Sequence, residues 1–79
     1  MLIQVLGSGC AKCRQLEENA RRAADELNLD FRLEKVSSLQ EIMSFGVMLT
    51  PALVLDGEVK TAGKVPDVAE IKKMLQAST

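Results

Sequence analysis

Apolar positions along the chain first form a short continuous block and then recur at helical spacing. Residues 2–6 are nearly all apolar, which is typical of a strand that is buried on both faces. From Cys13 to Leu27 the apolar residues recur mostly every three or four positions, and the positions between them are largely charged. The pattern predicts a strand and then a long amphipathic helix, which begins near Cys10 and which Asn28 can end.

The charged face of this predicted helix contains two pairs of opposite charge at i,i+4 spacing, Glu17 with Arg21 and Glu18 with Arg22. In both pairs the glutamate comes first, which is the favourable order on a helix. We therefore expect these side chains to pair with one another on a solvated face.

The middle of the chain predicts an edge strand and a short helix. Residues 31–36 begin by alternating between apolar and charged side chains, as a half-exposed strand does. Ser38 and Glu41 have the spacing of a capping box, which predicts a helix that runs to about Phe45. Gly46 then ends this helix.

The last third of the chain predicts a hairpin and a final helix. The apolar run 52–55, the turn pair Asp56-Gly57 and the alternating run 58–61 together are a strong hairpin signal. Pro66 and Asp67 then have the positions of a helix start.

The predicted order of elements is therefore β-α-β-α-β-β-α. Strands joined through a helix are expected to be parallel, whereas the hairpin strands are antiparallel. Two of the strands have apolar residues on both sides, so helices must cover both faces of the sheet. The fold class is α/β, with a mixed four-stranded sheet and helices on both faces, and the chain length favours a single domain over residues 1–79.

The composition of the chain argues against several classes of function and location. The net charge is −1 and the chain has no Trp or Tyr, which argues against nucleic acid as a partner. No apolar run approaches the roughly 18 residues of a membrane span, and the first residues do not have the basic start of a secretory leader. We expect a cytoplasmic protein without a membrane partner, in which two cysteines rarely form a structural disulfide.

The chain also contains no histidine. This excludes Ser-His and Cys-His nucleophilic catalysis, and it excludes zinc sites that include histidine ligands.

The strongest chemical signal is the segment Cys10-Ala11-Lys12-Cys13 between the first strand and the first helix. A CxxC pair at such a joint is typical of a redox-active dithiol. The unpaired N–H groups and the dipole of a helix start stabilise a thiolate there, and Lys12 can add to this effect. Because Cys13 begins the apolar stripe, we expect Cys10 to be the exposed nucleophile and Cys13 the shielded resolving cysteine.

The proline before the third strand and three of the methionines are interpreted as structural residues. The position of Pro51 at a strand start is expected, because proline cannot donate to a sheet ladder, and a trans bond is the more common case. Met43, Met48 and Met74 are interpreted as core residues and not as metal ligands.

The whole layout resembles that of the thioredoxin/glutaredoxin superfamily. It is most similar to the small prokaryotic thioredoxin-like proteins known as redox-active disulfide proteins. The similarity extends over nearly the whole chain and rests on three segments: Gly-Cys-Ala-Lys-Cys at 9–13, Thr-Pro-Ala-Leu-Val-Leu-Asp-Gly-Glu-Val at 50–59 and Ala-Gly-Lys-Val-Pro at 62–66. The resemblance implies a thioredoxin-like fold.

The resemblance also implies roles for individual residues. Cys10 would be the nucleophile and Cys13 the resolving cysteine. The Thr50–Pro51 peptide bond would be cis and would lie beside the two sulfurs. The backbone of Thr50 would then hydrogen-bond to an extended substrate chain, as in strand addition. Gly63 would keep the neighbouring loop thin enough for a partner to approach, although a simple turn explains this glycine equally well.

Four positions differ from the pattern of thioredoxins, and the three beside the cysteines are expected to tune the pair. Gly9 takes the place of a tryptophan, and Ala11-Lys12 takes the place of Gly-Pro. Thioredoxins also have a buried acid six residues before the first cysteine, where this chain has Gln4. We expect Lys12 or water to handle the proton of the resolving thiol instead.

These features favour a thiol–disulfide oxidoreductase that exchanges electrons with protein dithiols and disulfides and has no bound cofactor. The resemblance implies that a flavoprotein similar to thioredoxin reductase would regenerate it. One alternative is a copper carrier that uses the same two thiolates, although such carriers have the element order β-α-β-β-α-β. Another is a regulatory module that uses the disulfide as a switch without turnover.

Overall fold

A computed structural model of the chain describes residues 1–77 and confirms the predicted order of elements. The elements are β1 (Leu2–Leu6), α1 (Ala11–Glu26), β2 (Arg32–Val36), α2 (Leu39–Ser44), β3 (Ala52–Leu55), β4 (Glu58–Ala62) and α3 (Val68–Ala77).

The four strands form one mixed sheet in the order β2-β1-β3-β4. Strand β1 is parallel to β2 and antiparallel to β3, and β3 pairs with β4 as the predicted antiparallel hairpin. The central strands are β3, which is wholly apolar, and β1, which is apolar except for Gln4, whereas the alternating strands β2 and β4 are the edges. This arrangement buries the two most apolar strands.

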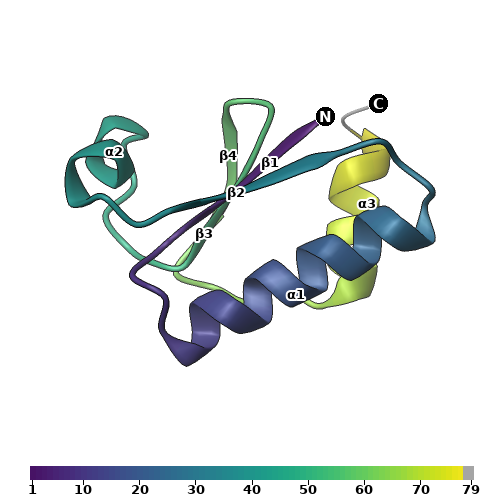
Figure 1. Cartoon of the computed structure of the whole chain (residues 1–79), viewed down its shortest axis with the longest axis horizontal. Coiled ribbons are helices and arrows are strands. Elements are labelled where there is room, and N and C mark those ends of the chain that lie inside the picture. The colour runs from purple at the N-terminus through teal and green to yellow at the C-terminus, as the bar shows by residue number, and fades with distance from the viewer. Residues whose placement is uncertain (78–79) are drawn as a thin grey trace.

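Helices cover both faces of the sheet. Helices α1 and α3 lie together on one side, and the short helix α2 lies on the other (Figure 1). The larger core is packed between the sheet and the helix pair α1 and α3; its fully or almost fully buried members are Ile3, Val5, Leu16, Ala20, Ala23, Ala24, Leu53, Leu55, Ile71 and Leu75. The smaller core lies under α2 and consists of Leu6, Val36, Ile42, Val47, Ala52 and Val54.

Left-handed backbone conformations occur where the sequence predicts chain reversals. Asp56 and Gly57 both have positive φ, 48° and 85°, as the two central residues of a type I′ hairpin turn require. Asn28 has a φ of 55° and ends α1. The Asp56 carboxylate also accepts a hydrogen bond from the Leu2 N–H at 2.7 Å, which attaches the hairpin turn to the start of β1.

The helix starts differ from the sequence prediction in one respect. Ser38 is the N-cap of α2, but its side chain makes no capping hydrogen bond, so the predicted capping box is wrong. The backbone closes this first turn alone, with the Ile42 N–H donating to the Ser38 carbonyl at 2.9 Å. At α3 the prediction is confirmed, because Asp67 Oδ1 accepts the Glu70 N–H at 2.8 Å.

Two of the three methionines that were interpreted as core residues are exposed. Met43 is 64% exposed and Met48 is 96% exposed, whereas Met74 packs against the larger core. Helix α2 has only six residues and buries Ile42 alone, so Met43 beside it faces outward. The core interpretation was therefore wrong for the α2 region.

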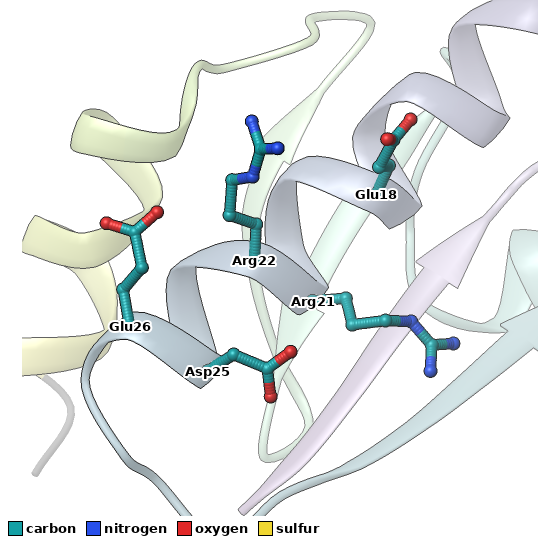
Figure 2. A pocket seen from close by; sticks show the side chains of 5 residues that line it. All are labelled: Glu18, Arg21, Arg22, Asp25 and Glu26. Carbon is teal, nitrogen blue, oxygen red and sulfur yellow. The ribbon is translucent and has the colours of Figure 1, made fainter.

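The charged face of α1 is solvated, as predicted, but its ion pairs differ. A shallow hollow on this face is lined by charged residues only, which are Glu18, Arg21, Arg22, Asp25 and Glu26 (Figure 2). Glu26 pairs with Lys72 of α3 at 2.8 Å, and this pairing, together with Arg22, lowers the pKa of Glu26. None of the helices in the described part of the chain is long and apolar enough to cross a membrane.

Candidate active site

The cysteine pair lies where the chain leaves the central strand β1 and enters α1. The Gly7 N–H donates to the Val36 carbonyl at 2.9 Å, so pairing with β2 continues one residue beyond β1. Gly9 then has a φ of +85°, which glycine adopts without strain. Cys10 follows in an extended conformation as the N-cap of α1. The glycines therefore turn the chain so that Cys10 lies at the mouth of the helix.

The two cysteines have the asymmetry that the sequence predicts. Cys10 is exposed, whereas Cys13 is only 5% exposed and belongs to the buried stripe of α1. Both are free thiols, and their Sγ atoms lie 2.8 Å apart. The Cys13 N–H also points at Cys10 Sγ, at 3.4 Å. The pair is thus positioned for one sulfur to react outward and the other inward.

These contacts lower the pKa of Cys10. The largest contribution is the hydrogen bond from the Cys13 side chain, followed by that from the Cys13 backbone N–H. A weaker effect of desolvation raises the pKa, and the backbone of Lys12 lowers it further. The thiolate is the reactive form of a cysteine. The helix start therefore favours a nucleophilic Cys10 sulfur.

This cause can be tested by changing Cys13. We expect Cys13→Ala to raise the pKa of Cys10, because alanine removes the side-chain donor and keeps the backbone N–H. Cys13→Ser is the matched control, since its hydroxyl can still donate. The pKa is measured from the alkylation rate of Cys10 as a function of pH. Equal Cys10 pKa values in the alanine variant and the unmodified protein would contradict the assignment.

Pro51 lies against the inner side of the cysteine pair. It is fully buried, and the Thr50–Pro51 peptide bond is cis. A Cβ atom placed on Gly7 would lie 2.3 Å from Cys13 Sγ and 3.9 Å from the Pro51 Cα, so these three residues meet in one place. The Pro51 carbonyl accepts the Gly63 N–H at 2.8 Å. The tertiary structure thus brings Pro51 and Gly63 to the cysteines from a distant part of the chain.

The remaining residues singled out from the sequence lie at the rim. Ala11 and Lys12 are exposed in the first turn of α1, and Thr50 is exposed just before Pro51. Gly63 has a φ of +75°, and a Cβ there would lie 3.0 Å from the Leu49 side chain. The turn interpretation of Gly63 is therefore confirmed, and the glycine also permits a close contact with Leu49 of the same chain.

Sequence reasoning missed two features of this site. The first of them is Gly7, to which the sequence pattern assigns no role, although the space occupied by Cys13 Sγ leaves no room for a side chain there. Glu17 was paired with Arg21, but its carboxylate instead lies 3.3 Å from Lys35 Nζ on β2. Neither feature has a local sequence signal, because each depends on how α1 is placed over β1 and β2.

Residues 1–77 contain no group of three or more Cys, Asp or Glu side chains that could hold a metal ion together. The element order also ends on helix α3, unlike the strand-terminated order expected of a copper carrier.

Comparison with known proteins agrees with this geometry. The family model of the thioredoxin domain matches residues 1–76 of the chain. A thioredoxin of Methanothermobacter thermautotrophicus is 45% identical over 75 residues, which cover 95% of this chain and 97% of the relative. A thioredoxin of Methanocaldococcus jannaschii is 38% identical over 77 residues, which cover 98% of this chain and 88% of the relative. The chain therefore belongs to the thioredoxin family of thiol–disulfide oxidoreductases, as a small prokaryotic thioredoxin-like protein.

Proposed function

We propose that this protein reduces protein disulfides through Cys10 as nucleophile and Cys13 as resolving cysteine. The observation that carries the proposal is the contact between an exposed and a buried sulfur, 2.8 Å apart, at the start of α1. The lowered pKa of Cys10 supports the same division of roles. The comparisons support thiol–disulfide exchange as the general reaction of the family. The roles of Cys10 and Cys13 in that reaction are the additional part of this proposal.

The reaction has two exchange steps. In the first, the Cys10 thiolate attacks one sulfur of a substrate disulfide and forms a mixed disulfide. The other substrate sulfur leaves as a thiolate, which then takes up a proton from solvent. In the second, Cys13 loses its proton and attacks Cys10 Sγ. The second substrate sulfur then leaves, and the protein is left with a Cys10–Cys13 disulfide. Two electrons have passed from the dithiol to the substrate.

The surface around Pro51 supports an extended protein chain as the substrate. Thr50 is exposed just before Pro51, and we propose that its backbone pairs with an added strand. Met48 and Leu49, which are 96% and 64% exposed, supply apolar surface just before it. Cys10 is flanked by small or flexible residues, which are Gly9, Ala11 and Lys12. A side chain at Gly63 would press against Leu49, so the glycine keeps this loop thin. We propose that these residues bind the substrate and tune the pair.

We further propose that residues 1–79 work as one domain, without a bound cofactor, in the cytoplasm. The oxidised pair must be reduced again after each turnover, which suits a reducing compartment. A flavoprotein similar to thioredoxin reductase is the proposed electron donor, by analogy with the family.

A redox titration tests the proposed function. The protein is equilibrated in dithiol redox buffers, free thiols are alkylated, and the products are weighed by mass spectrometry. We expect one two-electron transition between dithiol and intramolecular disulfide, with a midpoint between about −270 and −180 mV.

Cys10→Ser is the control for this titration, because it cannot form the intramolecular bond. Absence of that bond in the unmodified monomer would refute the oxidoreductase proposal. Binding of Cu(I) to the two thiolates would then be the next property to measure.

A further inference from the structure

The resolving step requires a group that takes the proton of Cys13. This thiol is 5% exposed, so most of its surface is shielded from bulk water. A pocket of about 190 Å³ nevertheless reaches it, between the start of α1 and the edge strand β2. A water molecule occupies about 30 Å³ in the liquid, so several fit in this space. The pocket therefore offers space for water beside Cys13.

Glu17 is the carboxylate that lines this pocket together with Cys13. It lies one helical turn after Cys13, at i+4, and residues at this spacing are neighbours on a helix surface. Its side chain is only 17% exposed and lies 3.3 Å from Lys35 Nζ. Lys35 in turn lies on β2 beside Val5 of β1. The sheet register thus positions the cation that holds the Glu17 carboxylate at the pocket.

The other groups near the cysteines are less suited to accept this proton. Lys12 is exposed and is not among the residues that line the pocket, and an ammonium group has no acceptor lone pair. Gln4 has no titratable group, and strand alternation directs it to the sheet face opposite Val5, where its amide donates to Glu34 at 3.4 Å.

We propose that Glu17 accepts, through water in this pocket, the proton that Cys13 loses as it attacks the mixed disulfide on Cys10. The inference rests on the proposed roles of the two cysteines and assigns a further residue to the second exchange. The proton moves from Cys13 Sγ to a Glu17 carboxylate oxygen, the Cys13–Cys10 bond forms, and the bond from Cys10 to the substrate sulfur breaks. The departing thiolate is then protonated by Glu17 or by solvent, which balances the step.

The charges around the pocket suit this transfer. Its charged lining residues, within the described part of the chain, are Arg14, Glu17 and Lys35. When the proton moves, the negative charge shifts from Glu17 to Cys13 while both cations remain nearby. The net charge of the pocket is therefore unchanged during the transfer, and no charge has to enter or leave a partly desolvated space.

The test separates the two exchange steps by rapid mixing of the reduced protein with an aromatic disulfide whose thiol product is coloured. Attack by Cys10 releases the first thiol, and resolution by Cys13 releases the second. We expect Glu17→Gln to slow the second release by about tenfold or more. This effect is smaller than that of a proton acceptor in direct contact with the thiol, because water relays the proton. The first release is expected to change far less.

Glu18→Gln is the matched control, because Glu18 is the next residue on α1 and lines the hollow on the exposed face instead. Glu17→Asp keeps a carboxylate and is expected to restore part of the lost rate even if the glutamine variant folds poorly. With increasing pH, the second rate is expected to level off in the unmodified protein and to keep rising in Glu17→Gln.

Three results would overturn the assignment. One is equal second rates in Glu17→Gln and Glu18→Gln, and another is an aspartate variant as slow as the glutamine variant. The third is the same pH profile with and without the carboxylate. Loss of the second release from the unmodified protein would instead refute the roles proposed for Cys10 and Cys13, so the two failures are distinguishable.

Discussion

A Cys10→Ser variant is expected to lose all measurable reduction of a protein disulfide such as that of insulin. The serine hydroxyl is not ionised near neutral pH, whereas the Cys10 thiolate is stabilised by the side chain and backbone N–H of Cys13. Cys13 cannot substitute, because it is only 5% exposed and faces the interior. The measurement is the rate of insulin precipitation in the presence of a small dithiol reductant.

The companion variant Cys13→Ser is expected to perform the first exchange and stop there. The mixed disulfide between Cys10 and the substrate then accumulates, and mass spectrometry detects it as a covalent adduct of one protein and one substrate chain. Full turnover by Cys13→Ser would contradict the resolving role of Cys13. Retained activity in Cys10→Ser would contradict the nucleophile assignment.

Gly7→Ala is expected to damage both the stability and the chemistry of the protein. The added Cβ would lie 2.3 Å from Cys13 Sγ and 3.3 Å from Cys13 Cβ. Either α1 must shift away from the sheet or the Cys13 side chain must rotate, which would move its sulfur from Cys10. Overpacking of this kind costs typically about 1–3 kcal/mol of folding free energy. Denaturant unfolding of the reduced protein measures this loss.

The same substitution is expected to slow closure of the Cys10–Cys13 disulfide by roughly tenfold to a hundredfold. Displacement of the Cys13 sulfur raises the activation free energy of closure, and about 1.4 kcal/mol of activation free energy corresponds to a factor of ten in rate. Gly57→Ala is the control, because Gly57 has a φ of 85° and nothing within 4 Å of an added Cβ. That variant should lose stability through backbone strain and keep its closure rate. A normal closure rate in Gly7→Ala would show that the Gly7 contact does not position Cys13.

Local sequence patterns were sufficient for the elements and for which of the two cysteines is exposed and which is buried. The helical stripe that begins at Cys13 predicts its burial, and the N-cap position of Cys10 predicts its exposure. The Asp56-Gly57 pair predicts the hairpin turn, because two consecutive residues with positive φ are required there. These features depend on neighbours within one or two turns of chain, which the sequence displays directly.

Local rules were less reliable where several elements compete for the same space. The spacing of Ser38 and Glu41 is that of a capping box, yet the backbone closes the turn without the serine side chain. Met43 and Met48 are apolar enough for a core but lie on the surface around α2. The six residues of this helix cover the smaller core with Ile42 alone, and no amphipathic pattern indicates how much area a helix will cover.

The sequence by itself determined the α/β order of elements, the CxxC pair at a helix start and the exposed and buried roles of its sulfurs. Only the tertiary structure decided that Pro51 and Gly7 meet at Cys13, and that Glu17 pairs with Lys35 beside the same sulfur. The physical reason is that periodicity describes which face of an element is apolar. The atoms that face one another across elements are set by sheet order, strand register and the placement of α1 over the sheet, which arise only when the whole chain packs.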